Sequence, residues 1–116
     1  MKLKMQEKSE HEIQKEIVSH LRNKGYYTIG TDVMSGLGFL GNNQGKRIAF
    51  INHHKGIGYT KGQPDFIAIK GSNIYFIECK DHKGARTKEQ KEIAEILQKQ
   101  GLNYILARGI EDVCNI

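Results

Sequence analysis

Two short apolar segments on either side of Gly71-Ser72 constrain the fold of this chain most, because their spacing predicts a β-hairpin with a defined register. Residues 65–70 and 73–80 are rich in β-branched and aromatic residues, which favour strands. A tight turn at Gly71-Ser72 pairs positions whose numbers sum to about 143. Asp65 is therefore predicted to lie opposite Glu78.

Two carboxylates and an ammonium group are predicted to meet on one face of this hairpin. Glu78 and Lys80 are two apart in a strand and share a face, whereas Cys79 points into the core. Converging carboxylates repel unless a cation lies between them, and Mg²⁺ takes one or two carboxylates with carbonyl and water ligands. We therefore expect Asp65, Glu78 and the Cys79 carbonyl to bind a divalent cation. Lys80 is suited to position or deprotonate a water and to stabilise charge on a phosphate.

A first helix is predicted from a Ser9 cap to about residue 24. Glu10 lies three positions before Ile13 and seven before Ile17, on the apolar side of this helix. A carboxylate there either complements the helix dipole or reaches into a site. Helical phase leaves these two interpretations even.

The remaining segments predict an α/β fold, with a small mixed sheet flanked by helices, as one domain over residues 1–116. Thr87 caps a second long helix, and Gln90 has the spacing of its capping-box partner. Residues 1–8 are expected to be frayed. The other predicted elements are a strand at 26–34, a loop at 35–46, a strand at 47–52, a loop at 53–63, a helix at 87–100, a strand at 103–107 and a short helix from 109.

Net charge is +5, which suggests a polyanionic partner. Trp is absent and the other aromatic residues are scattered, so phosphate contact is favoured over base stacking. No apolar run approaches the ~20 residues of a membrane span, and no signal peptide is evident, so we expect a cytoplasmic protein without membrane attachment. Cys79 and Cys114 have no metal-ligand spacing and are expected to be reduced.

Four motifs together resemble the VRR-NUC family of PD-(D/E)xK nucleases. They are Gly62-Gln63-Pro64-Asp65, Phe76-Ile77-Glu78-Cys79-Lys80, Thr87-Lys88-Glu89-Gln90 with the later Gly101, and Glu10-x-x-Ile13-Gln14. The resemblance covers residues 9 to 113, apart from a Gly-rich middle that is longer and more polar than the family pattern. It implies a restriction-endonuclease-like fold, Mg²⁺ or Mn²⁺ dependence, and cleavage of DNA at flaps or four-way (Holliday) junctions by a homodimer.

By matching motif, the resemblance gives catalytic roles to Glu10, Asp65, Glu78, Lys80 and Gln90, with Gln90 orienting Lys80 or a phosphate. Glu10 is a further candidate metal ligand. Basic residues elsewhere are predicted DNA contacts, although each also fits a solvated surface: Arg47, His53, His54, Lys55, Lys61, Lys83, Arg86 and Lys88. The alternatives are a non-catalytic nucleic-acid-binding module and a nuclease of the same fold that cuts RNA or serves in restriction.

Overall fold

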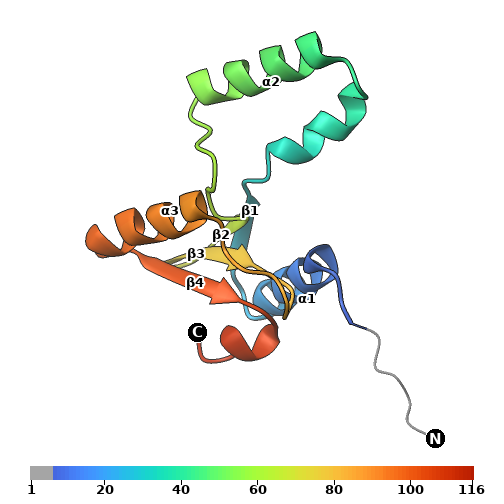
Figure 1. The fold of residues 1–116 in the computed structure, drawn as a ribbon. Coiled ribbons are helices and arrows are strands. Elements are labelled where there is room, and N and C mark those ends of the chain that lie inside the picture. The colour runs from blue at the N-terminus through green and yellow to red at the C-terminus, as the bar shows by residue number, and fades with distance from the viewer. Residues whose placement is uncertain (1–6) are drawn as a thin grey trace, which may run out of the picture.

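The computed structural model describes residues 7–116, apart from the side chain of Ser35 (Figure 1). Its elements in chain order are α1 (Glu10–Asn23), β1 (Tyr27–Gly30), the 3₁₀ helix η1 (Met34–Leu40), α2 (Gln44–Gly56), β2 (Phe66–Lys70), β3 (Asn73–Cys79), α3 (Lys88–Lys99), β4 (Asn103–Ala107) and the 3₁₀ helix η2 (Ile110–Asp112). Residues 1–6 of the segment expected to be frayed lie outside this range. No helix in residues 7–116 is long and apolar enough to span a membrane.

The four strands form one mixed sheet in the order β1-β2-β3-β4, which confirms the predicted α/β class. β1 pairs with β2 and β2 with β3 in antiparallel fashion, whereas β3 and β4 run parallel. Phe66 pairs with Ile77, so the hairpin has the predicted register. The turn between β2 and β3 uses Gly71 at φ 61°, a conformation that glycine adopts without strain.

The sheet is covered on both faces. α1 buries Ile13, Ile17 and Leu21 against a core that includes Phe66 and Cys79. On the opposite face, side chains of α3 line one cavity with residues of β2 and β3, namely Ile93, Leu97, Ile67 and Phe76. Cys79 is buried and Cys114 exposed, and both are free thiols as predicted.

Both long helices begin where their capping residues predict. The Ser9 hydroxyl accepts a hydrogen bond of 3.2 Å from the Glu12 N–H. At α3, the Gln90 N–H donates to the Thr87 hydroxyl at 3.2 Å, and the Thr87 N–H donates to the Gln90 side-chain oxygen at 2.8 Å. These reciprocal bonds form the predicted capping box.

The middle of the chain was predicted wrongly. Residues 47–52 are not a strand, and the predicted loops at 35–46 and 53–63 are not wholly irregular, because η1 and α2 occupy most of this segment. The Asn43 side chain caps α2 by accepting from the Lys46 N–H at 3.0 Å. β1 is also shorter than the predicted strand at 26–34, because the chain turns away from the sheet after Gly30.

Residues 33–61, which we call the arm, connect β1 to the segment before β2 through η1 and α2. Figure 1 shows η1 and α2 (cyan to green) standing away from the sheet and from the other helices. No residue of α2 is buried. The arm therefore contributes little to the core.

Candidate active site

Asp65 lies at the start of the central hairpin and is held by both its backbone and its side chain. Its N–H donates to the Ile77 carbonyl at 3.0 Å, which extends the β2–β3 ladder by one residue. Its Oδ2 accepts a hydrogen bond of 2.7 Å from the Cys79 N–H. The carboxylate is thereby fixed against β3, next to Glu78.

Glu78 is the buried charged residue of the described chain, with 1% of its surface exposed. Neither of its carboxylate oxygens has a hydrogen-bond partner among residues 7–116. Burial, reinforced by the adjacent Asp65 and opposed by Lys80, raises the pKa of Glu78 to about 9. A buried carboxyl group without a hydrogen-bond partner lowers the stability of the folded chain. Glu78 therefore indicates a functional rather than a stabilising role at this position.

Lys80 and Glu10 complete the predicted group. Lys80 is half-buried directly after β3, where its N–H donates to the Ala107 carbonyl at 3.1 Å. Glu10 is half-buried in the first turn of α1. Burial raises the pKa of Glu10 above its ordinary value, with Lys80 opposing the shift and Asp65 adding to it. The structure thus brings Glu10 within electrostatic range of both residues, as the helical phase allowed.

The donor set fits a hard divalent cation. No cluster of three or more His, Cys, Asp or Glu side chains suited to a metal occurs within residues 7–116. Mg²⁺ and Mn²⁺ do not need one, because water and carbonyl oxygens commonly complete a shell begun by two carboxylates. A cation beside Glu78 and Asp65 would satisfy the two unpartnered oxygens and relieve the repulsion between the carboxylates.

No protein-family model and no curated protein matches the sequence. Among solved structures, one described as "VRR_NUC domain" superimposes with a TM-score of 0.63, at 18% identity, over 91% of this chain and 90% of that chain. The chain has the VRR_NUC fold. This similarity confirms the restriction-endonuclease-like architecture that the motifs implied, and at this identity it bears on the fold alone.

Gln90 has a structural role in this VRR_NUC fold, whatever else it does. Its side-chain oxygen is engaged in the α3 capping box. Gln90 also lines a cavity of about 170 Å³ together with Asp65, Gly62, Met34 and Tyr59. It therefore lies beside the candidate site, with its amide nitrogen free of the cap.

The glycine that opens the Gly-Gln-Pro-Asp motif allows a close contact with α3. Gly62 has φ 90°, and a Cβ there would lie 2.6 Å from the Glu89 carbonyl carbon and 2.7 Å from the Gln90 nitrogen. Gln63 ties the same segment to the end of β1, because its amide nitrogen donates to the Thr31 carbonyl at 2.7 Å. Asp65 is thus positioned by the packing of the Gly-Gln-Pro-Asp motif against α3 as well as by its own backbone pairing with β3.

Tyr104 was missed by the sequence analysis. Its hydroxyl is buried without a hydrogen-bond partner in the described chain. Burial raises the pKa of Tyr104, Arg86 opposes the shift, and the negative charge of Glu78 adds to it. The Arg86 guanidinium lies 5.8 Å from the Tyr104 ring centroid, an approach compatible with a cation–π contact. Strand alternation could have identified Tyr104, because Leu106 pairs with Glu78 and Tyr104 shares its face.

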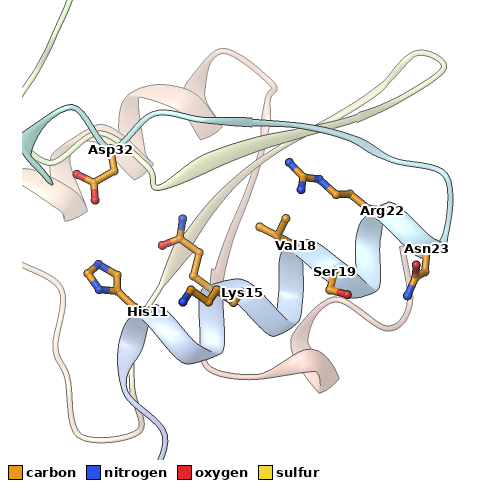
Figure 2. Close-up of a pocket in the computed structure, with 8 residues that line it drawn as sticks. His11, Lys15, Val18, Ser19, Arg22, Asn23 and Asp32 are labelled. Carbon is orange, nitrogen blue, oxygen red and sulfur yellow. The ribbon is translucent and has the colours of Figure 1, made fainter. Parts of the chain in front are cut away.

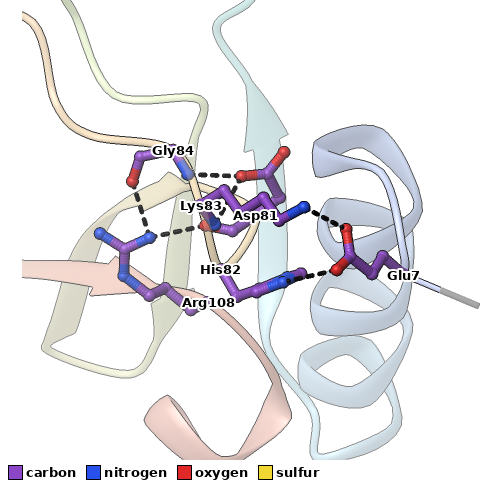
Figure 3. Close-up of polar contacts among 6 residues, drawn as sticks. All are labelled: Glu7, Asp81, His82, Lys83, Gly84 and Arg108. Atoms are coloured by element: carbon purple, nitrogen blue, oxygen red, sulfur yellow. Dashed lines mark hydrogen bonds and ion pairs between the residues drawn. The ribbon is translucent and has the colours of Figure 1, made fainter. Parts of the chain in front are cut away.

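The loop after Lys80 is held in shape by Arg108 (Figure 3). The Arg108 guanidinium donates to the Asp81 and Gly84 carbonyls at 2.6 and 2.7 Å. At the outer side of this loop, Glu7 forms ion pairs with Lys83 at 3.3 Å and, when the ring is protonated, with His82 at 3.1 Å. Arg108 therefore fixes the chain between the candidate site and α3.

The predicted DNA-contact residues fall into two groups. The first lies on the arm, where Lys61 follows α2 and the others lie on α2, which corrects the loop placement of the two histidines: Arg47, His53, His54, Lys55 and Lys61. The second lies in the loop after Lys80 and at the start of α3: Lys83, Arg86 and Lys88. Two members form exposed ion pairs, Lys61 with Glu89 at 3.6 Å and Lys88 with Glu92 at 3.9 Å, which fits a solvated surface for them.

A larger cavity, about 490 Å³, lies away from the candidate site, between α1 and the segment that carries Asp32 (Figure 2). His11, Lys15, Val18 and Arg22 line it from the helix, and Asp32 lies across from them. None of Asp65, Glu78 or Lys80 lines it. The larger cavity is therefore separate from the candidate site.

Proposed function

We propose that this chain is a metal-dependent endonuclease that hydrolyses DNA phosphodiester bonds, with specificity for branched DNA such as a Holliday junction or a flap. The observation that carries the proposal is the buried Glu78 carboxyl, unpartnered within residues 7–116 and adjacent to Asp65 and Lys80. The VRR_NUC fold supports it. So does the convergence of Glu10 on the same site.

Each residue has a role that its surroundings permit. Asp65, Glu78, the Cys79 carbonyl and Glu10 would hold Mg²⁺ or Mn²⁺, which supplies charge stabilisation at the phosphate and lowers the pKa of a water ligand. Lys80 Nζ would orient the attacking water and, as the neutral amine, accept its proton; the ammonium so formed would stabilise negative charge at the phosphate oxygens. The amide nitrogen of Gln90 orients Lys80 or a phosphate oxygen. Asp65 is held by the Cys79 N–H, so its position does not depend on the substrate.

Branched DNA suits a homodimer, because two active sites can then cut two strands of one substrate. The dimer, the preference for branches and a cytoplasmic location belong to this proposal and rest on the family resemblance. The basic residues on the arm, in the loop after Lys80 and at the start of α3 would contact phosphates, a mode of binding that needs no base readout.

A cleavage panel tests the proposal. Single-stranded, flap, duplex and four-way-junction DNA would each be incubated with the full chain and Mg²⁺, Mn²⁺ or EDTA. We expect metal-dependent cleavage, fastest on a branched substrate, and its loss in Asp65→Ala and Lys80→Ala variants that keep the native circular dichroism spectrum. Full activity of either variant contradicts the proposal.

Two other results would redirect the assignment. DNA binding without cleavage under any divalent metal would instead indicate a non-catalytic binding module. Faster cleavage of RNA than of any DNA would indicate a ribonuclease with the same fold. Light scattering of the chain alone and with a junction would test the dimer directly.

A further inference from the structure

Most of the net charge of this chain lies on the arm. Residues 33–61 contain four basic residues, Lys46, Arg47, Lys55 and Lys61, and no Asp or Glu. The chain has 18 basic and 13 acidic residues in all, so the remainder has 14 and 13, a net charge of +1 against +4 for this segment. A positive field of this kind, concentrated on one projecting element, attracts a polyanion.

The two lysines of α2 are exposed, whereas its arginine takes part in the contacts that brace the arm. Its half-buried residues face η1: Arg47, Phe50, Ile51 and His54. Arg47 Nη1 donates to the Leu37 and Gly41 carbonyls at 3.1 and 3.0 Å, and the rings of Phe50 and His54 lie 4.3 Å apart. Lys46 and Lys55 are exposed, and neither forms an ion pair with any described residue. Arg47 thus shapes the arm, which leaves Lys46 and Lys55 available to a partner.

The helical phase of α2 gives the arm a shape that fits a groove. Opposite the face that contacts η1, the exposed side of α2 bears Gly45, Ala49, Asn52 and Gly56. Lys46 and Lys55 lie on the two flanks of this side, near opposite ends of the helix. The B-DNA major groove, about 12 Å wide, admits an α-helix, and its borders are the phosphates of both strands.

The two connections of the arm lead to the candidate active site. Met34, at the start of η1, and Tyr59, in the segment after α2, line the same cavity as Asp65 and Gln90. Both ends of the arm therefore lie beside Asp65. α2 has 13 residues and is about 20 Å long, which corresponds to about 6 base pairs of B-DNA.

We propose that the arm binds duplex DNA next to the cleaved bond, with the exposed side of α2 in the major groove and with Lys46 and Lys55 on the phosphates of the two strands. This inference rests on the proposed nuclease function and assigns its substrate-holding element. A second copy of the chain is the alternative occupant, because Phe39, Ile48 and Ile57 are also exposed on the arm. Charge favours DNA, since packing arm on arm would bring two +4 segments together without an acidic residue in either.

The experiment measures the affinity of the full chain for a 20-base-pair fluorescent duplex in EDTA, by anisotropy, at several salt concentrations. Lys46→Ala/Lys55→Ala is compared with Lys91→Ala/Lys99→Ala, which removes the same charge from exposed positions of α3. We expect the arm variant to bind about tenfold more weakly at 0.1 M salt and its log–log salt slope to fall by about 2, whereas the α3 variant keeps the wild-type slope. A second pair tests the groove: Ala49→Trp should weaken binding, and Gln98→Trp, at an exposed position of α3, should not.

The outcomes separate this inference from the proposed function. Equal salt slopes for the two lysine variants overturn the inference, even if the wild type cleaves DNA. Arm-dependent binding without metal-dependent cleavage sustains the inference and contradicts the nuclease. If the arm variants change the mass in solution and leave DNA affinity unchanged, the arm is an interface between copies of the chain, and the inference fails.

Discussion

The Cys79 N–H donates a hydrogen bond of 2.7 Å to the Asp65 carboxylate. The backbone of β3, the strand that carries Glu78, therefore also positions the Asp65 carboxylate. Asp65 precedes β2, and Glu78 is the neighbour of Cys79 in β3. The geometry of the two carboxylates is therefore fixed by the hairpin before any cation or substrate binds. Such preorganisation is what a site that stabilises developing charge requires.

Asp65→Asn separates this structural bond from the charge. The amide oxygen can still accept from the Cys79 N–H, so we expect a melting temperature at least equal to that of the wild type. Cleavage should fall about 100-fold or more, because a neutral amide is a poorer cation ligand. Differential scanning calorimetry and the junction-cleavage rate, measured on the same preparation, check both parts. A variant that melts lower yet cleaves normally would contradict both expectations.

Glu78 makes the stability of the metal-free chain depend on pH. Its pKa is about 9 in the folded chain and 4.5 unfolded, so the folded state binds the extra proton between these values and stability falls as pH rises from about 4.5 to 9. Glu78→Gln should remove this slope. In EDTA at pH 8.5 we expect the melting temperature of the variant to exceed that of the wild type by about 5 °C or more, since a shift of even one pKa unit changes the free energy of unfolding enough for this. At pH 4.5 the two proteins should melt at the same temperature.

Divalent metal should reverse the order of these two proteins. Cation binding requires the ionised Glu78 carboxylate, so Mg²⁺ or Mn²⁺ should raise the melting temperature of the wild type more at pH 8.5 than at pH 6. Glu78→Gln should respond little at either pH. The same thermal melts, with and without metal, check this, and Ca²⁺-free buffer with added NaCl at matched ionic strength is the control.

Thr87→Ala and Gln90→Ala distinguish a cap from a site residue. Both remove one half of the capping box, so each should cost about 1 kcal/mol of folding free energy, measured by urea denaturation. If Gln90 also orients Lys80 or a phosphate, the cleavage rate should fall at least about tenfold further in Gln90→Ala than in Thr87→Ala. Equal cleavage rates in the two variants would show that Gln90 serves only to cap α3.

Gly62→Ala tests the packing of the Pro-Asp segment against α3. The new Cβ would clash with the backbone at Glu89 and Gln90 and would require a non-glycine residue at φ 90°. We expect a loss of about 2 kcal/mol or more. Gly58→Ala is the matched control, because Gly58 also has a positive φ, 120°, but has open space around it. The difference between the two variants measures the contact with α3.

Local signals predicted the parts of the fold on which the candidate site depends. Gly71-Ser72 fixes the register that places Asp65 opposite Glu78, and the capping residues Ser9 and Thr87 indicate where two helices begin. Both signals could be read from the sequence because turns and helix caps depend on residues only a few positions apart. Burial was not predicted: Glu78 is 1% exposed, because burial depends on how elements far apart in the sequence pack together.

The arm was mispredicted for a related reason. Residues 47–52 contain the apolar, partly β-branched run Ile48 to Ile51, which favours a strand where a neighbouring strand exists. No such neighbour reaches the arm in the described chain, so the run is helical. The Asn43 cap was the signal for this helix that the strand assignment overlooked.

The arm leaves the sheet and returns to it at a single point. Gly30 pairs with Phe66, the Thr31 N–H donates to the Asp65 carbonyl at 2.9 Å, and the excursion between them supplies no buried residue of α2 to the core. In topological terms η1 and α2 are an insertion into the β1–β2 hairpin. A short turn could join β1 to β2 at the same pair, Gly30 and Phe66. An arm of different length or sequence could thus be grafted at this pair, so evolution or design can change what the arm contacts without rebuilding the hairpin that carries Asp65 and Glu78.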